Sequence, residues 1–227
     1  MSRFAGIPTD AIAFYAELEE HNSREWFAAN KERYEQSVRE PIVALTDALA
    51  EEFGPARIFR PHRDVRFSRD KTPYKTEQGA IATAPDGTGY YLRIDAEGLT
   101  TGGGYMHAMP DQVARYRTTV DEDSAGSQLA DIVHELRRSG FNIGGETLKT
   151  SPKGIAADHP RIDLLRHKSI IVWRERGTPK WLNTAAVVRH VRDDWRSVRP
   201  LVEWIREHVG PTTMPMPAPD RRRGTRD

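Results

Sequence analysis

The 227-residue chain contains no cysteine, which excludes disulfide bonds, thiol catalysis and metal sites built from cysteine. It also has no run of about 18 apolar residues, the length that a membrane-spanning helix requires, so we expect no membrane insertion. The first residues lack the apolar core of a signal peptide. We therefore expect a cytoplasmic protein.

An excess of one charge sign is also missing, since 34 Lys and Arg stand against 33 Asp and Glu, for a net charge of +1. This balance argues against the globally basic surface of a general nucleic-acid binder. The spacings of a metal-binding His-Glu-x-x-His motif and of a nucleotide-binding glycine loop are absent as well. Gly102, Gly103 and Gly104 fit neither the dinucleotide-binding nor the phosphate-binding glycine motif. From these absent spacings we expect no metal and no cofactor.

Hydrophobic spacing and turn residues predict helices and strands in an alternating order. We expect the second helix to begin with Asn22 as its N-cap, paired with Glu25, and we expect Pro200 to kink or divide the last helix. The expected helices cover residues 9–20, 22–38, 41–53, 110–120, 129–140, a short stretch after 160, and 185–208. The expected strands cover residues 80–84, 90–95, 99–106, 148–149 and 169–173.

This order predicts an α+β fold in which a central antiparallel sheet is flanked by N-terminal and C-terminal helices. The short turns at Asp86-Gly87 and Glu97-Gly98 indicate that three of the strands form a meander. We expect one domain over residues 1–210. Residues 211–227, rich in Pro and Arg, are expected to form a disordered tail.

Positive charge is concentrated in residues 60–75, where six Arg or Lys accompany only two acids. The charges follow no helical period. The surrounding sequence is specific: Arg63-Asp-x-Arg-Phe-Ser-x-Asp-Lys-x-Pro-Tyr-Lys75 follows a segment 22–34 with Asn, Trp, Phe and Tyr, and precedes Gly102-Gly-Gly104. With further matches at Leu148-Lys149 and Pro152-Lys153-Gly154, the pattern resembles a bacterial and fungal family of conserved proteins of unknown function, the domain of unknown function 2461 type. The resemblance implies a family-defining set of residues and assigns no reaction.

Arg and Lys beside hydroxyl groups are suited to bind phosphate or carboxylate, because guanidinium groups donate paired hydrogen bonds to such anions. We therefore expect a small anionic ligand as the partner. Lys149 and Lys153 are expected to close over the same anion, although a Pro-Lys-Gly turn is also an ordinary exposed connection. The candidate ligand-binding residues are Arg63, Arg66, Ser68, Arg69, Asp70, Lys71, Tyr74, Lys75, Lys149 and Lys153.

Two other interpretations remain open. The chain could be a nucleic-acid-binding module, which the lack of interleaved exposed aromatic residues disfavours. Alternatively, the basic segment could be an internal salt-bridge network in a structural or interaction protein. The first 56 residues contain eleven acids and five bases, so acidic helices could face the basic segment. Neither a reaction nor an oligomeric state follows from these residues.

Overall fold

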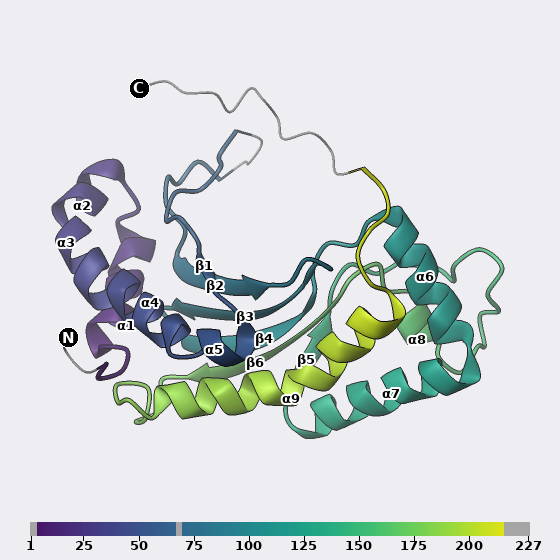
Figure 1. Cartoon of the computed structure of the whole chain (residues 1–227). Helices are drawn as coiled ribbons and strands as arrows, with labels where there is room; N and C mark the ends of the chain where they lie inside the picture. The colour runs from purple at the N-terminus through teal and green to yellow at the C-terminus, as the bar shows by residue number, and fades with distance from the viewer. Residues whose placement is uncertain (1–3, 67–69, 216–227) are drawn as a thin grey trace.

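A six-stranded antiparallel sheet forms the centre of the fold in the computed structural model, which describes residues 4–66 and 70–215 (Figure 1). The strand order is β1-β2-β3-β4-β6-β5, so β1 and β5 form the two edges. Short turns join β2 to β3 and β3 to β4, which confirms the predicted meander. The strands are β1 (Arg57–Ile58), β2 (Glu77–Thr83), β3 (Thr88–Asp95), β4 (Gly98–Tyr105), β5 (Asn142–Gly144) and β6 (Ile170–Gly177).

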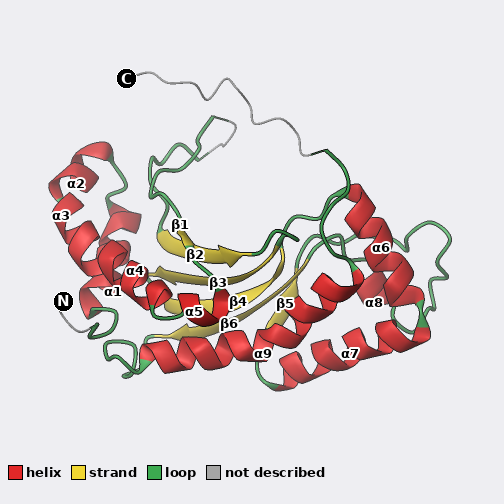
Figure 2. Ribbon diagram, viewed as in Figure 1, coloured by secondary structure: helices red, strands yellow, loops and turns green. Residues whose placement is uncertain are grey.

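Helices lie at both ends of the sheet and across one of its faces (Figure 2). With this sheet they confirm the predicted α+β fold. The N-terminal helices are α1 (Thr9–Glu20), α2 (Arg24–Ala29), α3 (Lys31–Tyr34), a π-helical turn (Glu35–Arg39), α4 (Glu40–Asp47) and α5 (Ala50–Phe53). The later helices are α6 (Pro110–Asp121), α7 (Asp123–Arg138), α8 (Ile162–Leu165) and α9 (Val187–His208). None of the helices in the described ranges combines the length and apolarity of a membrane span.

The long helix α9 covers one face of the sheet and carries the centre of the core. Trp195 is fully buried there, and its indole Nε1 donates to the carbonyl oxygen of Tyr91 at 3.0 Å. Its neighbour Asp194, only 2% exposed, accepts hydrogen bonds from Thr101 of β4 at 2.7 Å and from Arg174 of β6 at 2.9 Å. A buried carboxylate is stable only when its charge is matched, and these partners also fix α9 on the sheet.

Two local predictions were wrong. The N-cap of α2 is Ser23, whose hydroxyl accepts from the amide of Trp26 at 3.1 Å, and not Asn22. Pro200, which we expected to kink or divide the last helix, lies inside α9 and does not divide it. Residues 148–149 form no strand, since β5 is formed instead by residues 142–144, which pair with β6.

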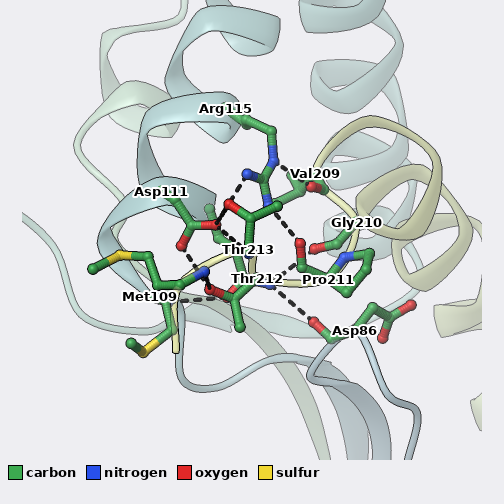
Figure 3. A network of polar contacts seen from close by, with 11 residues as sticks. Asp86, Met109, Asp111, Arg115, Val209, Gly210, Pro211, Thr212 and Thr213 are labelled. Atoms are coloured by element: carbon green, nitrogen blue, oxygen red, sulfur yellow. Dashed lines mark hydrogen bonds and ion pairs between the residues drawn. The ribbon is translucent and has the colours of Figure 1, made fainter. Parts of the chain in front are cut away.

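The segment after α9 is bound to the start of α6 (Figure 3). Asp111 accepts from the Thr212 hydroxyl and from the Thr213 amide, both at 2.8 Å. Arg115 donates to the carbonyl oxygen of Pro211 at 2.7 Å. These contacts hold residues 211–213 to the domain, beyond the expected boundary at residue 210. Residues 216–227 of the expected tail lie outside the described residues.

Candidate functional site at the open face of the sheet

The basic segment forms a loop between β1 and β2, and we call residues 59–76 the basic loop. Its two arms run antiparallel and continue the pairing of the strands. The amide of Arg63 donates to the carbonyl oxygen of Pro73, and the amide of Lys75 donates to that of Pro61, both at 2.8 Å. The backbone of both arms is therefore tied to the sheet edge.

Tyr74 anchors this loop to helix α2. Its ring stacks on Phe27 with 3.9 Å between centroids and 9° between planes. The side chain of Asn22 holds the Tyr74 backbone with two hydrogen bonds of 3.0 Å, one to its amide and one to its carbonyl. Because the Tyr74 ring is buried, its main contact is with the core rather than with the loop's cations.

Towards its tip, the basic loop matches cations with its own carboxylates. Arg63 forms an ion pair with Asp70, and Arg66 makes a two-point contact with Asp64 at 2.9 and 2.7 Å. Both pairs join residues of the same loop. Such pairs fix the local shape of the loop.

Three other candidates lie between Arg66 and Thr72 in the sequence. The ammonium group of Lys71 donates to the carbonyl oxygen of Val65 at 2.9 Å. Ser68 and Arg69, which we predicted as ligand contacts, lie outside the described residues.

At the base of the loop, cations gather that form no ion pair within the part of the chain that the structure describes. Lys75 Nζ lies 5.2 Å from the ring centre of Phe59, and the guanidinium carbon of Arg57 lies 4.9 Å from the same ring. Within residues 4–66 and 70–215, the side chains of Arg57, Arg60 and Lys75 form no ion pair or hydrogen bond with another group. Partial burial lowers the pKa of Lys75; Glu77 opposes this, and Arg60 and Arg57 add to it. A bound anion would therefore gain the most electrostatic stabilisation at this base.

The base of the loop adjoins the face of the sheet that helix α9 does not cover. Here a cavity of about 390 Å³ opens on the sheet. Phe59 connects the two, since its ring lies 6.3 Å from that of Tyr91. The side chains that shape the cavity are Ile81, Tyr91, Arg93, Met106, Ile171 and Trp173.

The charged group in this cavity wall is already matched by acids. Arg93 contacts Glu77 at 3.0 Å and Asp95 at 3.2 Å. Burial alone would lower the pKa of Arg93, but the two carboxylates outweigh it and raise that pKa. The Tyr91 hydroxyl also approaches Glu77, at 3.4 Å, and burial raises the Tyr91 pKa. The cavity is thus an apolar, aromatic surface beside an unmatched positive group.

Lys149 and Lys153 lie away from the basic loop. Both are exposed in the segment between β5 and α8. The basic loop leaves the sheet at the β1 edge, whereas this segment leaves it at the β5 edge, with four strands between them (Figure 1). The structure does not bring the two sets of predicted residues together.

Comparison with protein families gave a match over residues 10–204 to the family described as conserved hypothetical protein (DUF2461). The chain belongs to this family. The matched region contains the basic loop, the whole sheet and most of α9. A search among curated proteins gave no match. The family description assigns no activity, so the functional argument rests on the geometry of the site.

Several residues of the family region that line the site were not among the predicted ones. Arg57 and Phe59 lie just outside the motif, and Tyr91 and Trp173 lie on strands. The alternation of Tyr91 and Arg93 with the buried Leu92 indicates two faces of a strand. The density of charged residues in the sequence indicates the loop tip instead.

Proposed function

We propose that the protein binds a small ligand carrying a phosphate or carboxylate at the base of the basic loop, beside the cavity on the open face. The observation that carries this proposal is the group formed by Arg57, Arg60 and Lys75, which form no ion pair within the described residues, although the charge of Glu77 acts on Lys75. Like charges held together without a counter-ion repel one another, and a bound anion removes that repulsion. A cavity of this volume also lies in the range of small-molecule sites.

The loop tip has a different part in this proposal. Arg63 and Arg66 are held by Asp70 and Asp64, so an anion would have to compete with carboxylates that are already bound. We propose that these two pairs shape the loop, while Lys75 contacts the ligand directly. Lys71, with Ser68 and Arg69, remains a proposed ligand contact, whereas the buried Tyr74 ring holds the loop on α2.

The proposal is tested by thermal unfolding of the whole chain with phosphate, nucleotides, sugar phosphates, carboxylates and short oligonucleotides at matched ionic strength. A ligand that binds the folded state alone raises the melting temperature in a saturable manner. Lys75→Met should abolish this shift. Lys149→Met, an exposed lysine at the opposite edge of the sheet, should retain it. Equal shifts in both variants, or no shift with any anion, would refute the proposal.

The ion pairs of the tip favour a second role, in which this part of the motif is structural. Arg66 and Asp64 keep side-chain exposures of 56% and 42%, and pairs so exposed contribute at most about 1 kcal/mol. Arg66→Ala should therefore lower the melting temperature only slightly. If it abolishes anion binding while the fold is intact, the tip contacts the ligand; a collapse of several kcal/mol would mean that the motif is a structural network.

A further inference from the structure

The open face of the sheet has a glycine floor at its centre, on strand β4, whose residues are all buried. Tyr91 of β3 pairs with Gly102 of β4, and Gly102 pairs with Trp173 of β6, so the two aromatic residues flank a glycine. Gly104 lies two residues further along the same face of β4. A Cβ atom at Gly102 would lie 2.1 Å from the carbonyl oxygen of Val172. Backbone, not side chain, therefore forms this floor.

Both aromatic side chains lean away from the floor. The Tyr91 hydroxyl lies towards β2, 3.1 Å from where a Cβ of Gly79 would stand. The Trp173 ring lies towards β5, with its Cζ3 2.8 Å from where a Cβ of Gly144 would stand. Glycines on the neighbouring strands thus give each ring the room to tilt outwards. Both rings line the 390 Å³ cavity together with Gly103 of β4, and we call the space between the two rings the trough.

The shape and the charge of this trough specify one kind of occupant. A flat ring can lie in this cavity between two aromatic side chains and contact both, because aromatic pairs favour offset-stacked or edge-to-face arrangements. The unmatched cations of the loop base stand at one side, where Phe59 separates Lys75 from Tyr91. Three strand spacings, about 14 Å, separate β1 from β4. A ring joined to a phosphate through a sugar fits this distance once a long basic side chain reaches towards it.

Building on the function proposed above, we propose that the ligand is a mononucleotide. Its base lies in the cavity between Tyr91 and Trp173, and its phosphate lies at Arg57, Arg60 and Lys75. The ring supplies apolar contact and the loop base supplies charge. Neither half of the site requires the carboxylates of Glu77 and Asp95 to leave Arg93.

The test compares the four ribonucleoside 5′-monophosphates with ribose 5-phosphate and with adenosine, by calorimetric titration of the full chain. Ribose 5-phosphate lacks the ring, and adenosine lacks the phosphate. At least one monophosphate should bind about 10-fold or more tightly than ribose 5-phosphate, because burial of a ring removes apolar area from water. Trp173→Leu should remove this advantage and leave the binding of ribose 5-phosphate unchanged. Trp181→Leu, a partly buried tryptophan stacked on His190 outside the cavity, should retain it.

The outcomes separate the two proposals. If monophosphates and ribose 5-phosphate bind equally well, the trough inference is wrong and the anion site remains. If adenosine binds as tightly as AMP, the anion function is wrong. If none of these probes binds, both proposals fail. An oligonucleotide that binds far more tightly than any monophosphate, with a steep salt dependence, would replace the mononucleotide by a nucleic-acid strand. Melting curves of each variant confirm that a lost titration reflects the site and not unfolding.

Discussion

Two carboxylates of this protein each pair with more than one arginine. Ranking them by burial and ranking them by the number of partners lead to opposite predictions of which one stabilises the fold more. Glu52 pairs with three arginines of α9, and Asp194 pairs with two of β6. Counting partners would make Glu52 the more important residue. Asp194, however, is 2% exposed whereas Glu52 is 26% exposed, and water replaces a lost partner only at the exposed site. We therefore expect Asp194→Asn to destabilise the fold far more than Glu52→Gln.

The magnitudes follow from the surroundings of each carboxylate. Removal of one partner from a buried ion pair costs about 3–5 kcal/mol. Arg174 and Arg176 retain 18% and 27% exposure, so they recover some hydration and the lower end of that range applies. Asparagine also keeps an acceptor for the Thr101 hydroxyl. We expect a loss of about 3 kcal/mol for Asp194→Asn and at most about 1 kcal/mol for Glu52→Gln.

Urea unfolding followed by far-ultraviolet circular dichroism measures both losses. With a denaturant slope of about 2 kcal/mol per molar, the midpoint should fall by about 1.5 M for Asp194→Asn and by at most about 0.5 M for Glu52→Gln. The denaturant slope should stay constant in both variants, which shows that the same folded and unfolded states are compared. Equal shifts, or a larger shift for Glu52→Gln, would refute the reasoning that burial outweighs the number of partners.

Three other perturbations test separate parts of the structure. Gly102→Ala should lower the free energy of unfolding by more than about 1 kcal/mol in urea titration, because its Cβ would meet the carbonyl of Val172; an unchanged midpoint would contradict the close packing of β4 and β6. Burial lowers the pKa of His167, so the unfolded chain binds its proton more readily and stability should fall as the pH drops below about 6.5; His167→Gln should flatten that slope. Asp111→Asn should speed hydrogen exchange at the Thr213 amide while the melting temperature changes little; unchanged exchange would show that other contacts hold the segment.

Local signals in the sequence predicted the elements whose causes are local. The strands of the meander are short runs with strand character, and the turns between them contain glycine, so the antiparallel sheet could be expected before the structure. The core face of α9 could be expected as well, from the helical spacing of Val188, Val191, Trp195, Val198, Val202 and Ile205, all of which are buried except the half-buried Val188.

Long-range partners explain the local errors. Asn22 has the right type and place for an N-cap, but its side chain binds the backbone of Tyr74, 52 residues later in the chain. Ser23 caps the helix instead. Pro200 removes one amide from α9, yet tertiary packing of the buried residues on both sides keeps the helix continuous. No local pattern distinguishes these outcomes from the expected ones.

The location of the site depends on two structural features that the number of charges in the sequence does not reveal. The first is which cations already have partners: Arg63 and Arg66 carry the motif, but Asp70 and Asp64 hold them. Lys75 has the same formal charge and lacks such a carboxylate within the described residues. An anion gains most binding free energy where positive charge is unmatched. The proposed binding residues therefore lie at the base of the loop and not at its tip.

The second fact is which face of the sheet remains open. The sequence of β3 shows that Tyr91 and Arg93 share one face, but not that helices cover the other. The row from Tyr91 through Gly102 to Trp173 also requires β6 to pair with β4, although α6, α7, β5 and α8 separate them in the chain. A floor of glycine between two aromatic residues therefore exists only after the chain has folded. An anion-binding motif read alone leaves the ligand unspecified, whereas the motif beside this floor favours an anion that carries a flat ring.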